Sequence, residues 1–222
     1  ELVATVSHDL KQPLSVMNGY LQLLEMHEQL DARGESFVRM IAKSIDHMRH
    51  LIDDVLDLAK IESGIALNLQ PVDVEVLIFQ CIEGVKPLAD SKEMQLDIDL
   101  STNLPHIAGD PNRLLQIFNN LVGNAVKYTQ QAGKVKVSVE RLDHTLRFMV
   151  RDNGMGISPE DQAHIFDRFY RVRRAETEHI EGTGLGLAIV KKLIEAHHGQ
   201  IGLESSLGEG TTFYVTLPVY TE

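Results

Sequence analysis

The chain has 222 residues, of which 43% are hydrophobic and 24% charged, and this length allows one or two domains with a sizeable core. Its 32 acidic and 21 basic side chains give a formal net charge of −11 at pH 7, which argues against a nucleic-acid-binding protein. The single cysteine, Cys81, excludes an intramolecular disulfide, and no apolar run approaches the roughly 20 residues of a membrane-spanning helix.

Residues 1–66 have the pattern of two helices joined by a short break at 31–35, which predicts an antiparallel hairpin. Each helix carries an apolar seam with alternating steps of three and four. The seam residues are Val3, Val6, Leu10, Pro13, Met17, Tyr20 and Leu24 in the first helix, and Phe37, Ile41, Ser44, Met48, Leu51, Val55 and Leu58 in the second. With the flanking Ile45, Ile52 and Leu56, this is more apolar surface than one hairpin covers. We therefore expect a homodimer in which two hairpins form a four-helix bundle.

Residues 67–222 mix helical patterns with short β-rich runs. Helices are predicted over 73–90, 110–128 and 184–198, and strands near 94–100, 134–141, 145–151, 200–205 and 211–217. Asp110 is the expected N-cap of the second helix, with Pro111 in its first turn, and Gly199 is expected to close the third. The pattern predicts an α+β fold with helices on one face of a mixed sheet.

His8 is a candidate nucleophile in the first predicted helix. It falls at the outermost heptad position, where an exposed imidazole is largely neutral at pH 7. Asp9 could hold the Nδ1 proton and leave Nε2 free, although neighbouring helical residues do not face each other. Pro13 clashes with the carbonyl of Asp9 and so bends the backbone beside His8. The alternative is a surface histidine without a catalytic role.

Three polar side chains share one face of the helix predicted at 110–128. Asn120, Asn124 and Lys127 recur in steps of four and three. Carboxamide oxygens suit Mg²⁺, and a lysine supplies a point charge for phosphate. The alternative is a polar face in contact with water.

Two glycine clusters flank the irregular part of the sequence. Residues 152–156 (Asp-Asn-Gly-Met-Gly) follow a strand, and residues 182–187 (Gly-Thr-Gly-Leu-Gly-Leu) open a helix. Glycines there allow backbone N–H groups to approach a phosphate. The second cluster lacks the βαβ context and the third glycine of a dinucleotide fingerprint, and either cluster taken alone could be only a turn.

Residues 165–174 interleave aromatic and arginine side chains between the glycine clusters. This composition predicts a mobile lid whose basic groups face the phosphates of a ligand. The alternative is a surface helix with Phe166 and Phe169 packed inward.

Together these motifs resemble the H, N, G1, F and G2 boxes of sensor histidine kinases of two-component systems, in the order of that family. The matching segments are His8–Asp9 with Pro13, 120–129, 152–156, 166–171 and 182–187. The resemblance covers essentially the whole chain. It implies a dimerisation and histidine phosphotransfer hairpin at 1–66 and an ATP-binding α/β sandwich, of the type shared with gyrase and heat-shock chaperone ATPases, at 67–222.

The resemblance also implies roles for individual residues. Asp152 accepts a hydrogen bond from the adenine amino group, Asn124 holds Mg²⁺ with Asn120 beside it, and Lys127 reaches the phosphates. The adenine pocket includes Tyr128, Gly154 and Gly156. The triphosphate is bracketed by Gly182, Thr183, Gly184, Leu185 and Gly186, under a lid that contains Phe166, Phe169 and Arg171.

The implied function is that of an ATP-dependent protein histidine kinase, which phosphorylates His8 and passes the phosphoryl group to an aspartate of a response regulator receiver domain. An ATPase of the same nucleotide-binding type and a pseudokinase scaffold are the rival functions. Gln12 stands where family members with phosphatase activity carry Thr or Asn, so the sequence leaves open whether the chain dephosphorylates its regulator. It also leaves open whether phosphorylation occurs in cis or in trans. Because the chain begins at Glu1 inside a helical pattern, we expect a cytoplasmic fragment of a longer protein, which the membrane could anchor only through other parts.

Overall fold

The structure is a computed structural model that describes residues 11, 14–24, 31–64, 67–172 and 182–220. The chain divides into two compact units, Glu1–Ile65 and Ala66–Glu222. Each unit has its own core.

The first unit contains two helices. Residues 14–24 form the first, and α2 (Ala32–Glu62) forms the second. Asp31 caps α2, because its carboxylate accepts a hydrogen bond from the Gly34 N–H at 2.7 Å. An ion pair between Lys11 and Asp53 joins the two helical segments.

The core of this unit differs from the predicted seam. Its buried cluster is formed by Leu14, Leu21, Val38 and Ile45, with Ala42 and Ile52 packed against it. Most of the seam residues that the structure describes are instead exposed, including Met17, Tyr20, Leu24, Phe37, Ile41, Met48 and Val55. The helices therefore pack against each other through the stripe beside the seam, which leaves the seam itself as an uncovered apolar face.

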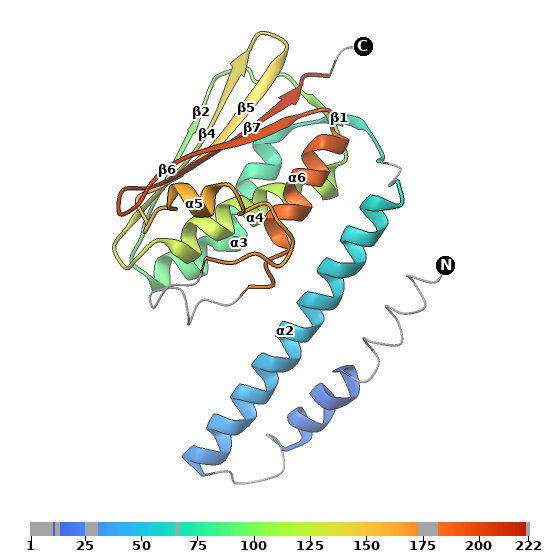
Figure 1. The fold of residues 1–222 in the computed structure, drawn as a ribbon, viewed down its shortest axis with the longest axis vertical. Coiled ribbons are helices and arrows are strands. Elements are labelled where there is room, and N and C mark those ends of the chain that lie inside the picture. The colour runs from blue at the N-terminus through green and yellow to red at the C-terminus, as the bar shows by residue number, and fades with distance from the viewer. Residues whose placement is uncertain (1–10, 12–13, 25–30, 65–66, 173–181, 221–222) are drawn as a thin grey trace. The chain divides into compact units, whose positions relative to one another are not determined.

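The second unit is built on a five-stranded mixed sheet with the order β2-β4-β5-β7-β6 (Figure 1). The strands are β2 (Gln95–Leu100), β4 (Lys134–Leu142), β5 (Thr145–Asp152), β6 (Gln200–Ser206) and β7 (Gly210–Pro218). The pair β2–β4 is parallel and the other three pairs are antiparallel. The α+β prediction with a mixed sheet is confirmed.

Three helices lie on one side of this sheet: α3 (Val74–Ser91), α4 (Pro111–Tyr128) and α6 (Gly186–Ala196) (Figure 1). The predicted cap of α4 is confirmed, because the Asp110 side chain accepts from the N–H groups of Asn112 and Arg113. Alternate residues of the central strands point at the helices and are buried, and the rings of Phe118 and Phe148 lie 4.5 Å apart between α4 and β5. The short α5 (Pro159–Gln162) stands in the irregular segment between β5 and α6.

Two local features were not predicted. A small antiparallel sheet pairs β1 (Gln70–Val72) with β3 (Ile107–Gly109), and each strand is too short to show an alternating pattern. At the end of α6, His198 and not Gly199 adopts the left-handed conformation, with φ of 57°. Gly199 is needed for another reason, since a Cβ there would lie 2.4 Å from the Thr216 carbonyl oxygen.

Among the described residues, no helix combines the length and the apolar composition needed to cross a membrane.

Candidate functional site

One face of α4 meets the glycine loop that precedes α6. A Cβ placed at Gly186 would lie 2.5 Å from the Asn120 side-chain oxygen, and one placed at Gly182 would lie 3.9 Å from Lys127 Nζ. The Asn120 amide group is turned back on its own helix, where it donates to the Gln116 carbonyl at 3.0 Å. The structure therefore brings two of the predicted motifs together.

Asn124 lies between these residues on the same face of α4 and is half-buried. Within the described residues its carboxamide makes no hydrogen bond. The described residues also contain no cluster of three or more His, Cys, Asp or Glu side chains suited to a metal. A cation near Asn124 would accordingly have few protein ligands and would take its other oxygens from water and a bound anion, which is the usual way Mg²⁺ binds.

The loop that begins at Gly182 is tightly turned and lies close to Phe169. Gly184 has a φ of 73°, and a Cβ there would lie 2.8 Å from the Phe169 carbonyl carbon. The Thr183 hydroxyl accepts a hydrogen bond from the Leu185 N–H at 3.2 Å. The helix α6 starts at Gly186 without a side-chain cap, so its first N–H groups are available to a negatively charged ligand.

Asp152 ends strand β5 and is only 8% exposed. Its Oδ1 accepts hydrogen bonds from the N–H groups of Gly154 at 2.9 Å and Thr211 at 3.2 Å. Burial raises the pKa of the Asp152 carboxyl, and the two backbone N–H groups oppose that rise. Among the described residues, the hydrogen bonds of this carboxylate all go to Oδ1 and none to Oδ2.

The turn after Asp152 is packed against the end of α4. A Cβ at Gly154 would lie 2.7 Å from the Tyr128 carbonyl oxygen and 3.2 Å from the Thr129 Cα, so no larger residue fits. Gly156 has a φ of 68°, and a Cβ there would lie 1.9 Å from the Ser206 carbonyl oxygen. The Thr129 hydroxyl is buried and has no partner in the part of the chain that the structure describes.

Lys92 holds the end of α4 in place and was missed by the sequence analysis. Its ammonium donates hydrogen bonds to the carbonyls of Val126, Lys127 and Thr129, each at 2.9 Å. Burial lowers the pKa of Lys92. A lysine that follows a helix is common, and its partners lie at least 34 residues away, so no local pattern indicates this role.

The predicted lid is described only up to Val172, and its remaining residues, 173–181, lie outside the described chain. Phe169 is 63% exposed and therefore does not pack inward, while Phe166 is half-buried with the Lys191 ammonium 5.6 Å from its ring centroid. Burial raises the pKa of the Tyr128 phenol, and the Arg171 guanidinium opposes that rise through its charge. Arg171 thus influences a residue at the end of α4.

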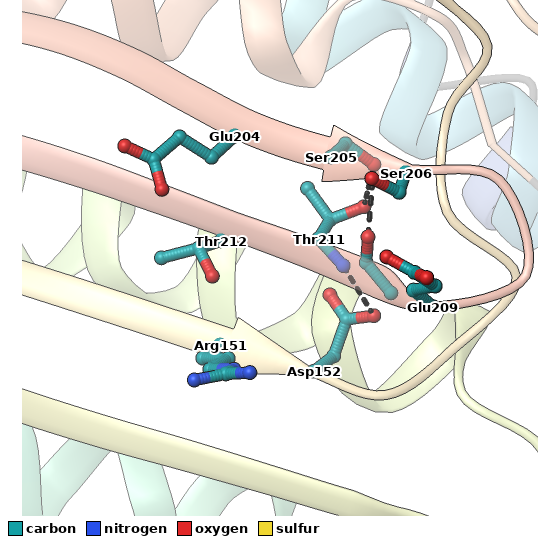
Figure 2. A pocket seen from close by; sticks show the side chains of 9 residues that line it. Arg151, Asp152, Glu204, Ser205, Ser206, Glu209, Thr211 and Thr212 are labelled. Atoms are coloured by element: carbon teal, nitrogen blue, oxygen red, sulfur yellow. Dashed lines mark hydrogen bonds between the residues drawn. The ribbon is translucent and has the colours of Figure 1, made fainter.

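An open hollow of about 260 Å³ lies where β5 and β6 end and β7 begins. Figure 2 shows its polar lining, in which Thr211 lies between Ser205 and Asp152 and is hydrogen-bonded to both. Asn124 and Lys127 do not line it, so the hollow adjoins the Asp152 end of the site and not the α4 face.

The three candidate residues of the hairpin, His8, Asp9 and Gln12, lie outside the described residues. Cys81 is buried, and burial raises the pKa of its thiol to about 12, so it stays protonated and unreactive at neutral pH.

Two family models match the chain. The model of the His Kinase A (phospho-acceptor) domain matches residues 1–64, and the model of the histidine kinase-, DNA gyrase B-, and HSP90-like ATPases matches residues 109–221.

Similar proteins match over nearly the whole length of the chain. Drug sensory protein A of Synechocystis sp. is 39% identical over 99% of the chain, and the sensor protein kinase WalK of Staphylococcus epidermidis is 35% identical over 98%. The chain spans 35% and 36% of those proteins, respectively. The crystal structure of full-length ShkA in complex with AMPPNP is 38% identical with a TM-score of 0.83, and it matches 100% of this chain and 46% of its own.

Proposed function

Since the chain belongs to the histidine kinase-, DNA gyrase B- and HSP90-like ATPases and is the transmitter core of a sensor histidine kinase, we propose that it transfers the γ-phosphoryl group of ATP to His8 and then to an aspartate of a response regulator. The observation that carries the proposal is the meeting of Asn120 and Lys127 with the glycine loop 182–186, because it joins a cationic helix face to an anion-binding turn.

We assign the adenine end of the ATP to the surroundings of Asp152. The Oδ2 of its carboxylate accepts a hydrogen bond from the adenine amino group, while the hydrogen bonds from the Gly154 and Thr211 N–H groups hold the carboxylate in position. Tyr128 and Gly156 form further parts of this pocket.

The triphosphate end lies, in this proposal, between α4 and the glycine loop. Lys127 and the backbone N–H groups at 182–186 bind the phosphate oxygens, and Arg171, Phe166 and Phe169 close over them. Asn124 holds Mg²⁺ with Asn120 beside it, and bound Mg²⁺ supplies positive charge that neutralises the phosphates during transfer. The AMPPNP bound in the similar ShkA structure supports a nucleoside triphosphate as the ligand.

The phosphoacceptor is His8, whose neutral imidazole attacks the γ-phosphorus through Nε2. The new N–P bond forms as the bond from phosphorus to the β,γ-bridging oxygen breaks, and ADP leaves. Asp9 holds the proton on Nδ1. The same phosphoryl group then passes to the carboxylate of a receiver domain, and Gln12 could orient a water for its later hydrolysis.

The uncovered apolar face of the hairpin supports a homodimer. Phe37, Ile41 and Val55 are each about half exposed on α2, and Tyr20 is 66% exposed on the first helix. Packing this face against a second copy completes a four-helix bundle.

Labelling with γ-phosphate-labelled ATP and Mg²⁺ tests the proposal. We expect acid-labile and base-stable label on the protein, lost in His8→Gln and strongly reduced in Asn124→Asp. Steady phosphate release without protein label would favour an ATPase, and absence of ATP binding would favour a pseudokinase scaffold. Mixed dimers, with one subunit lacking His8 and the other unable to bind ATP, separate cis from trans transfer.

A further inference from the structure

Ser205 is a half-buried hydroxyl on β6 that none of the predicted motifs contains. Its Oγ accepts a hydrogen bond from the Ile157 N–H at 2.8 Å and donates to the Gly210 carbonyl at 2.9 Å. It also lies 2.9 Å from the Thr211 hydroxyl oxygen. Figure 2 shows this hydroxyl beside Thr211 at the ends of the strands, with Asp152 on the neighbouring strand.

The number of protons decides the direction of these bonds. A serine hydroxyl has one proton and two acceptor sites, and a carbonyl can only accept. All three contacts are satisfied when Ser205 donates to Gly210 and the Thr211 hydroxyl donates to Ser205. Every donor and acceptor site of Ser205 is then used.

These bonds join three segments that lie around Asp152. Ile157 continues the loop that contains Gly154 and Gly156, Gly210 belongs to the β6–β7 turn, and Thr211 donates its backbone N–H to Asp152. Gln162 adds a second link, because its side-chain amide donates to the carbonyls of Ile157 at 2.8 Å and Ser205 at 3.0 Å. The position of the Asp152 carboxylate therefore depends on β6 through Thr211.

We propose that Ser205 is a positioning residue for nucleotide recognition, which sets the Asp152 carboxylate by fixing the Asp152–Ile157 loop and Thr211 against the β6–β7 turn. The inference rests on the proposed function, in which Asp152 accepts the adenine amino group. Ser205 does not touch the ligand. Its effect is on the choice of base, since a displaced carboxylate no longer distinguishes an amino group from a carbonyl oxygen.

The matched pair Ser205→Val and Ser205→Thr tests this in the full chain, because valine and threonine have the same shape and only threonine has a hydroxyl. Binding of ATP and of inosine triphosphate, which carries an oxygen in place of the adenine amino group, is measured by calorimetry. We expect the wild-type chain to bind ATP at least about tenfold more tightly than inosine triphosphate. In Ser205→Val the affinity for ATP falls about tenfold and the preference shrinks towards one, since the half-buried N–H of Ile157 loses its acceptor. Ser205→Thr keeps the ATP affinity and the preference for ATP within about threefold of the wild-type values.

The ratio of the ATP affinity to the inosine triphosphate affinity separates positioning from general destabilisation, because general destabilisation weakens the binding of both nucleotides equally. Thr216→Val, a hydroxyl removal on the same sheet, serves as the control and is expected to bind both nucleotides like the wild-type chain. A wild-type preference in Ser205→Val would overturn the inference. If Ser205→Val does not fold, Gln162→Met decides in its place: a reduced preference supports the inference and an unchanged one overturns it. Failure of the wild-type chain to bind ATP would overturn the proposed function itself.

Discussion

Replacing Lys92 with methionine tests how the end of α4 is held. The change keeps most of the aliphatic stem and removes an ammonium that donates to three carbonyls at 2.9 Å. A hydrogen bond to a charged group contributes about 1.5–3 kcal/mol, so three independent bonds would total roughly 4–9 kcal/mol. The net loss is smaller, because water can reach the carbonyls in the variant and because burial already costs the ammonium part of its hydration, as the lowered pKa of Lys92 indicates. We expect the free energy of unfolding to fall by about 2–4 kcal/mol.

Urea unfolding of the full chain, followed by far-UV circular dichroism, measures this loss. Amide hydrogen exchange of residues 111–128 assigns it to α4, where exchange should accelerate. Lys86→Met is the matched control, because Lys86 is exposed on α3 and its replacement should change stability by less than about 0.5 kcal/mol. A Lys92→Met chain as stable as the control, with unchanged exchange in α4, would refute the reasoning.

Three other predictions follow from single contacts. Asp152→Asn should weaken ATP binding, measured by calorimetry, by about a hundredfold through loss of a charge-assisted hydrogen bond. The unfolding free energy of the ligand-free variant, measured with urea, should stay the same or rise, because burial raises the pKa of this carboxyl and so opposes its charged form. A less stable variant would contradict the second expectation. Gly156→Ala and Gly208→Ala both place alanine at a positive φ, which costs about 1–2 kcal/mol. Only the Cβ of Gly156→Ala meets another atom, the Ser206 carbonyl oxygen at 1.9 Å, so only this variant should also abolish ATP binding. Equal ATP binding by the two variants would argue against this steric explanation. Burial lowers the pKa of His197, whose Nε2 accepts a hydrogen bond from the Asp110 N–H. As the pH falls below about 6.5, the unfolded chain therefore takes up a proton at His197 before the folded chain does, and the unfolding free energy should drop by up to about 1.4 kcal/mol per pH unit. His197→Gln should remove that part of the pH dependence.

Local patterns predicted the elements of the second unit well. The alternation of valines in β4 is visible in the sequence because one face of the strand is buried, and Asp110 with Pro111 marks the start of α4 by its own chemistry. The polar face of α4 and the glycine loop could be identified as candidates, and the structure places Asn120 beside Gly186.

Contacts between distant segments could not be predicted. Lys92 and Ser205 are ordinary residue types whose partners are set by the fold, and β1 and β3 are too short to show a period. In the hairpin the sequence shows two adjacent apolar stripes. It does not indicate which stripe packs inside one chain and which is left uncovered, and Ile45, which flanks the predicted seam, lies in the core.

In the proposed reaction His8 receives a phosphoryl group from ATP bound by Ala66–Glu222. The most direct measurement is tandem mass spectrometry of the chain after incubation with Mg²⁺ and ATP, handled at alkaline pH to preserve a phosphoramidate. We expect one phosphoryl group on the peptide that contains residues 1–11, with fragment ions that assign it to His8, and a strongly reduced amount of this phosphopeptide from Asn124→Asp. Phosphorylation of any other residue, or an unmodified His8 in a chain that binds ATP, would contradict the proposed reaction.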